Sequence, residues 1–191
     1  MTTSRLEAFS DGVLAIILTI MVLELKVPHG DDLNSLKSII PAFIGYILSF
    51  IYIGIYWNNH HHLMQSVEHV NGKVLWANMH LLFWLSLIPF ASGWMGENHF
   101  TQWPVAVYGI ILMMAGVAYY LLAHSLIKLH GKNSTLAVAL GKDKKGLISV
   151  LLCILGIGFS FINPWLGFSL YAAVAAMWFI PDKRIEEKLE K

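Results

Sequence analysis

Histidines are the most conspicuous polar side chains of this sequence. There are nine of them, and three are consecutive, at His60–His62. A metal ion needs its ligands on one face of an element, whereas consecutive helical residues point about 100° apart. The three rings cannot surround one ion, and no H-E-x-x-H motif accompanies them. We therefore expect no metal site and no cofactor, and we interpret the run as groups that hydrogen-bond inside a helix bundle or face water.

A second set of polar side chains lies near those ends of the apolar segments that we expect on the cytoplasmic side. Asp11 falls within the first turns of an apolar segment, and Trp57 and His61 are four residues apart and so share a helix face. Polar groups inside a membrane usually face the bundle interior and pair with one another. We expect this internal network to comprise Ser10, Asp11, Trp57, His61, Asn78 and His80. Its role stays open between structural support for the first helix and a proton relay.

Signatures of enzymes are missing from the sequence. It contains no Gly-rich phosphate loop, no G-x-S-x-G motif and no pair of acids within the apolar segments that suits acid–base catalysis. We predict that the protein is not an enzyme. The one cysteine, Cys153, excludes an internal disulfide, and the TVGYG filter of many potassium channels is absent.

The composition indicates which elements position these residues. Hydrophobic residues make up 57% of the 191 residues and charged residues only 13%, against about 25% charged in soluble domains. This composition predicts an all-α integral membrane protein with lipid as its surroundings. The formal net charge of +1 gives no argument for a nucleic-acid partner.

Hydropathy divides the chain into six apolar segments and predicts one transmembrane helix for each, in a single domain over 1–191. The segments cover residues 5–26, 37–62, 73–95, 102–129, 143–161 and 164–180, followed by a charged tail at 181–191. With the N-terminus inside, only Lys26 and Lys37 of the 13 Lys and Arg residues fall outside. This bias predicts a multi-pass protein of the cell membrane with cytoplasmic N- and C-termini.

The first helix shows the clearest pattern. Ser4 and Glu7 form a capping-box pair that predicts the helix start, and Pro28 prevents its continuation. On a helical wheel one stripe contains Phe9, Gly12, Ile16, Thr19, Ile20 and Leu23, and Asp11 lies roughly opposite. Such a stripe is typical of helix packing, although packing alone needs neither the ordered stripe nor the acid.

The start of this helix reads R-x-x-x-F-S-D, with Arg5, Phe9, Ser10 and Asp11. With the apolar run that follows, it resembles the transmembrane protein 175 family of potassium channels. The later segments agree, and the resemblance covers essentially the whole chain: Trp57 with His60–His62, then Asn78 and His80, then LSLIPFASGW at 85–94. Animal members carry two six-helix repeats, so this single-repeat sequence resembles the prokaryotic members.

The resemblance implies a potassium-selective channel, with K⁺ and other monovalent cations as permeant ions, in a homotetramer whose first helices surround a central pore. Carried over by position, Ile16 forms the tightest hydrophobic ring, Thr19 a hydroxyl layer, and Ile20 and Leu23 further rings. Rings of branched side chains gate by dewetting, so conduction requires the constriction to widen. Without carbonyl rings we expect selectivity weaker than that of TVGYG channels.

Other interpretations stay open at this point. Glu24 either concentrates cations at the outer mouth or pairs with Lys26 or Lys37 at the surface. A different class of function is a proton-coupled secondary transporter that uses Asp11 and His80, although the chain lacks an evident inverted repeat. A scaffold that transports nothing would leave the first motif unexplained.

Overall fold

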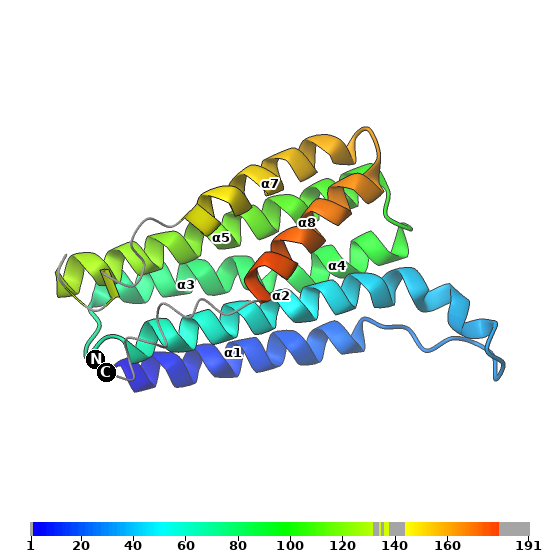
Figure 1. Cartoon of the computed structure of the whole chain (residues 1–191). Coiled ribbons are helices and arrows are strands. Elements are labelled where there is room, and N and C mark those ends of the chain that lie inside the picture. The colour runs from blue at the N-terminus through cyan, green and yellow to red at the C-terminus, as the bar shows by residue number, and fades with distance from the viewer. Residues whose placement is uncertain (1, 132–133, 135, 138–143, 180–191) are drawn as a thin grey trace.

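The computed structural model describes residues 2–131, 134, 136–137 and 144–179, and these form a helical bundle (Figure 1). One isolated β-bridge joins Thr2 to His69. The helices are α1 (Thr3–Leu23), the 3₁₀-helix η1 (Ser35–Ile39), α2 (Ile40–Gln65), α3 (Gly72–Ser86), α4 (Ile88–Glu97), α5 (Gln102–His130), α7 (Lys144–Ser160) and α8 (Pro164–Phe179). The charged tail predicted at 181–191 lies outside the described residues.

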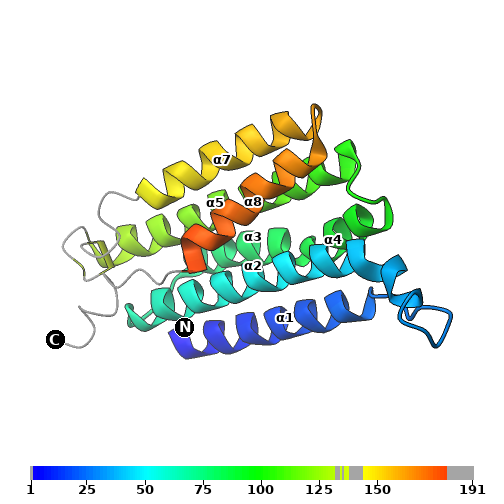
Figure 2. The same ribbon diagram turned by 45° about the vertical axis from the view of Figure 1, so that its right-hand side comes forward.

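Four helical stretches are long and apolar enough to cross a membrane, so the expected all-α membrane class is confirmed. These stretches cover Thr3–Leu23, Ser35–Gln65, Gly72–Glu97 and Gln102–His130. The described parts of α7 and α8 are shorter apolar helices of 17 and 16 residues, or about 25 Å at 1.5 Å per residue. Successive stretches run in alternating directions along the bundle (Figures 1 and 2).

The segment predicted as one helix over 73–95 consists of two helices that meet at Leu87. Pro89 has no backbone N–H and its ring clashes with the carbonyl four residues earlier, so the α-helical ladder cannot pass this point. The Leu87 N–H instead bonds the Trp84 carbonyl at 3.3 Å, and the ladder resumes with the Ala91 N–H on the Leu87 carbonyl at 3.1 Å. The chain therefore changes direction inside this stretch.

The capping box predicted at Ser4 and Glu7 is wrong. Helix α1 begins at Thr3 with Thr2 as its N-cap, and no side chain caps it. Ser4 already lies in the first turn, where its hydroxyl bonds the Thr2 hydroxyl at 3.3 Å. The pairing of Thr2 with His69 fixes the chain just before the helix, which explains the earlier start.

Helix α1 lies on one side of the bundle and α7 on the other (Figure 2). Helix α1 packs on α2, α3 and α4, while α5 packs on α3 and α7, and α7 on α8. Two hydrogen bonds in the core tie α2 to α5 and α8, in surroundings where an unpaired polar group is costly. Tyr52 donates to the Tyr171 carbonyl at 2.7 Å, and the hydroxyls of Ser49 and Tyr108 lie 3.0 Å apart.

Candidate functional site

The stripe recognised on α1 faces away from its own bundle. Phe9, Ile16 and Leu23 are 51%, 61% and 76% exposed, and Gly12, Thr19 and Ile20 are exposed as well. The opposite face of the same helix is buried in the core through Leu6, Leu14, Ile17 and Met21. Because the chain buries one apolar face of α1 and leaves the other uncovered by its described residues, the exposed stripe is left for lipid or for another chain.

Thr19 presents an oxygen on this stripe. Its hydroxyl proton is donated to the Ala15 carbonyl at 2.9 Å, which fixes the direction of the O–H bond. The remaining lone pairs of the oxygen are left for the exposed side. This arrangement suits the acceptance of a hydrogen bond or the coordination of a cation.

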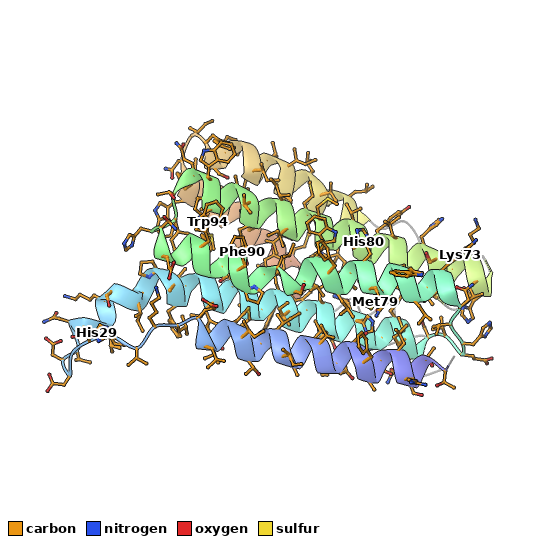
Figure 3. All side chains as sticks on the ribbon, turned by 180° about the vertical axis from the view of Figure 1, so that it is seen from behind. His29, Lys73, Met79, His80, Phe90 and Trp94 are labelled. Atoms are coloured by element: carbon orange, nitrogen blue, oxygen red, sulfur yellow. The ribbon has the colours of Figure 1, made fainter. Side chains whose placement is uncertain are left out.

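A groove runs beside the stripe, between α1 and α4. It has a volume of about 580 Å³, and Ile16, Ile20 and Glu24 of α1 line it. On its other side are Phe90 and Trp94 of α4, whose rings stack at 6.1 Å between centroids, and Figure 3 labels both side chains. The stripe therefore has an aromatic wall next to it in the same chain.

The acid of the first helix faces the other way. The Trp57 indole N–H donates to the Asp11 carboxylate at 3.0 Å, so Asp11 is held against α2. The Trp57 ring lies nearly parallel to the ring of His61, with centroids 6.2 Å apart. This bond fixes the rotation of α1 about its own axis and keeps the charge away from the stripe.

A buried chain of hydrogen bonds joins α1, α2 and α3. The Asn78 amide donates to Ser10 Oγ at 3.0 Å, and Ser10 donates in turn to the Leu6 carbonyl at 2.9 Å. His60 Nε2 lies 2.7 Å from the Asn78 carbonyl oxygen. Since that oxygen only accepts, Nε2 carries the proton. Ser10, Asn78 and His60 are all buried, so this chain links three helices where water cannot replace it.

A second link between α1 and α2 involves Glu7, which was expected to cap the helix and was not part of the predicted network. His61 Nδ1 donates to the Glu7 carboxylate at 2.6 Å. Gln65 Nε2 lies 2.8 Å from the other ring nitrogen of His61. His60 was expected to hydrogen-bond inside the bundle or face water, but it was not included in the predicted network. It lies on the buried face of α2 with Ile53 and Met64, seven residues before and four after.

His80 belongs to a separate contact. The Trp84 indole N–H donates to His80 Nε2 at 2.9 Å, one turn further along α3. The structure thus gives Asp11 and His80 different partners on different helices. It joins Ser10 to Asn78 directly, and Asp11 to Trp57, but it leaves His80 (labelled in Figure 3) in its own pair.

The opposite end of α1 carries charged residues. Lys26 pairs with Glu97 at 2.5 Å, and this hydrogen bond and charge raise the pKa of the lysine. Glu24 lines the groove next to this pair. Arg5 is exposed at the start of the helix. Within the described residues, no three His, Cys, Asp or Glu side chains gather as a metal site would require.

Comparisons with known proteins give consistent matches. Residues 5–89 match the family profile described as "Endosomal/lysosomal potassium channel TMEM175". A protein of Chryseobacterium sp. named as a potassium channel is 57% identical over 191 residues, which is 100% of both chains. One of Streptomyces collinus, also named as a potassium channel, is 30% identical over 61% of each chain.

A solved structure matches almost the whole fold. It is described as the crystal structure of a lysosomal potassium-selective channel TMEM175 homolog from Chamaesiphon minutus. The two chains superpose with a TM-score of 0.82 and 27% sequence identity, over 94% of this chain and 97% of that one. The similarity therefore includes α7 and α8, which lie beyond the matched family profile.

Proposed function

The chain belongs to the TMEM175 family, and from this premise we propose that it is a potassium-selective channel of the cell membrane. The relative from Chryseobacterium, similar over its full length, is named as a potassium channel, and the matching solved structure is described as potassium-selective. The observation that carries the proposal is the exposed apolar stripe of α1, with one hydroxyl in it.

The pore is formed by four copies of α1 around a common axis in a homotetramer. Each copy turns its stripe to the axis, so that Ile16, Ile20 and Leu23 form apolar rings and Thr19 a hydroxyl layer between them. These side chains are exposed in a single subunit, so the stripe is free to meet the same stripe of another subunit. Phe9 and Gly12 continue the same face toward the cytoplasm.

Gating and selectivity follow from the chemistry of these rings. Narrow rings of Ile and Leu side chains exclude water, so ions pass only when the rings move apart. The Thr19 oxygen has lone pairs to offer because its proton is engaged by Ala15. Four such oxygens replace part of the hydration shell of K⁺, which is released more readily than that of Na⁺.

The topology consists of six spans with both termini in the cytoplasm. Helices α3 and α4 together form the third span, and α7 and α8 form the last two. The alternating directions of the helices support an even number of spans, and the Lys and Arg distribution supports the orientation.

The polar contacts of α1 hold the pore helix in position. Asp11 fixes its rotation through Trp57, while Ser10 and Asn78 fix its depth against α3. Arg5, at the start of the motif, is exposed and available to a neighbouring subunit or to lipid headgroups. On this proposal the network serves as structural support, and no proton passes through it.

A planar-bilayer recording of the purified protein tests the function. With potassium and sodium on opposite sides, we expect single-channel steps and a reversal potential displaced toward the potassium equilibrium. A reversal potential near zero would contradict selectivity. A saturating flux coupled to a pH gradient, without single-channel steps, would favour the transporter that uses Asp11 and His80.

A further inference from the structure

A second cavity lies on the side of α2 that faces away from α1. It has a volume of about 260 Å³ and is enclosed by α2, α5, α7 and α8. We call this cavity the lateral slot. A cavity of roughly 150 Å³ is enough to hold benzene in an engineered protein, so the lateral slot has room for a substantial apolar group.

The lateral slot is elongated along the helices. Its walls reach from Tyr52 to Asn59 on α2, from Leu112 to Tyr120 on α5, and from Gly146 to Cys153 on α7. At 1.5 Å per residue each wall is about 11 Å long. One leaflet contributes about 15 Å to the hydrocarbon core, so the slot passes through most of one leaflet.

The chemistry of the lateral slot changes along its length. Its deep end is apolar, with Leu112, Cys153 and Val174, whereas Trp178 and Ser149 lie toward its mouth. The polar groups at the mouth already have partners. The Trp178 indole donates to Ser149 Oγ at 2.8 Å, and Ser149 donates to the Lys145 carbonyl at 2.8 Å. An apolar chain therefore fits the interior better than a polar ligand does.

A basic side chain lies beside the mouth. The Lys145 ammonium lies 5.8 Å from the centre of the Trp178 ring. Trp and Tyr side chains favour the membrane interface, and a basic group between membrane helices attracts acidic lipid headgroups. Tyr120 and Leu147 line the slot and are 57% and 75% exposed, so the slot opens sideways between α5 and α7.

We propose that the lateral slot binds one acyl chain of an anionic phospholipid, whose phosphate lies next to Lys145. The apolar walls, the length matched to a leaflet and the basic mouth together favour this occupant. The chain's own tail at 181–191 is a poor alternative, because all its residues except Pro181, Ile185 and Leu189 are charged. The proposal requires the chain to lie in a membrane but does not depend on which helix lines the pore.

Gly116 allows the lateral slot to be filled without removal of any side chain. It lines the slot, and a Cβ atom built on it meets only the Tyr56 hydroxyl, at 3.7 Å. Gly116→Leu therefore places its side chain in the space of the acyl chain. Gly158→Leu is the matched control, because Gly158 is exposed on α7, has nothing within 4 Å of its built Cβ and does not line the slot.

Photolabelling of the purified full-length chain tests the proposal. The vesicles consist of phosphatidylcholine with a trace of diazirine-bearing phosphatidylglycerol, and labelled peptides are mapped by mass spectrometry. We expect labelling concentrated on the slot walls of α5 and α7, lost in Gly116→Leu and retained in Gly158→Leu. We also expect Lys145→Gln to reduce labelling by phosphatidylglycerol to the level of a phosphatidylcholine probe.

Labelling spread evenly over the lipid-facing helices, or unchanged in Gly116→Leu, would overturn the site. Equal labelling of the wild type by the phosphatidylglycerol and phosphatidylcholine probes would contradict the preference for an acidic headgroup. Lys145→Gln leaves the interior of the lateral slot intact, so the headgroup assignment stays testable even where Gly116→Leu fails to fold. No recording of ion currents enters the test, and its outcome is therefore separate from that of the proposed channel function.

Discussion

The indole N–H of Trp57 donates to the carboxylate of Asp11 at 3.0 Å and joins α1 to α2. This bond turns the only acid of the motif toward the bundle and leaves the apolar stripe on the other face of α1. The rotation of α1 is therefore held by this charge-assisted hydrogen bond at a partly exposed position, together with the bond of His61 to Glu7 and the buried bonds of Ser10.

Trp57→Phe removes the donor but keeps most of the ring. We expect it to lower the free energy of unfolding by about 1 kcal/mol, since the site is partly exposed and the bond involves a charged acceptor. The fraction of tetramer should fall as well. Thermal unfolding in detergent and light scattering measure the two effects. Trp76→Phe, at an exposed position on α3, is the control, and equal stability of both variants would argue against this role of the bond.

Asn78→Ala breaks the buried chain between the three helices. It leaves the His60 N–H without its acceptor and Ser10 without its donor, and we expect a cost of about 2 kcal/mol. Asn98→Ala removes only an exposed bond to the Trp94 carbonyl and should cost far less. Chemical unfolding in detergent compares the variants, and a smaller loss for Asn78→Ala than for Asn98→Ala would refute the assignment.

Ile16→Asn places a polar group in the proposed constriction. If the barrier of the dry ring falls by about 1.4 kcal/mol, the leak current rises about tenfold. Ile154→Asn, the same substitution at an exposed position of α7, should leave the current unchanged. Flux from potassium-loaded vesicles is the measurement. A current that responds to neither variant would show that Ile16 is not at the gate.

Thr19→Ala removes the hydroxyl layer, whereas Thr19→Ser retains it. We expect the alanine variant to lose about 1 kcal/mol of discrimination, or roughly fivefold in the ratio of potassium to sodium permeability. The serine variant should keep most of the ratio. Reversal potentials in a potassium–sodium gradient give both values, and an unchanged ratio in Thr19→Ala would exclude a selectivity role for this oxygen.

Glu24→Gln tests whether the outer mouth concentrates cations. Glu24 lines the groove beside the ion pair of Lys26 and Glu97. We expect a lower potassium conductance in dilute salt and a shrinking difference as added salt screens the charge. The double variant Lys26→Gln with Glu97→Gln preserves the net charge and serves as the control. A difference independent of salt would point to a structural effect instead.

Much of α1 could be predicted from the sequence, because its polar residues break an otherwise apolar pattern. Asp11 and the stripe opposite it were both evident there, and the structure gives them opposite directions. Their roles at a pore remain predictions. Pro89 in the sequence indicates the break at Leu87. Hydropathy does not detect it, because the segments on both sides of the break are apolar.

Hydropathy could not show which histidine of α2 forms the hydrogen bond with Asn78. Helix α2 is apolar on nearly all sides, because lipid and the bundle core both favour such side chains, so its buried face leaves little trace in the sequence. His61 looked as suitable as His60, and the structure selects His60 for Asn78 and gives His61 to Glu7. The lateral slot left no signal either, because it depends on how four helices pack against one another.

The junction between α3 and α4 has a mechanical consequence. Pro89 has no N–H to donate, so one rung of the helical ladder is missing beside Leu87, and a proline is a common place for a helix to bend. On the α3 side of this junction, Asn78 is hydrogen-bonded to Ser10 of α1. On the α4 side, Phe90 and Trp94 line the groove along Ile16 and Ile20. A bend at this junction would therefore reshape the groove beside Ile16 and Ile20 while the bond between Asn78 and Ser10 stays in place.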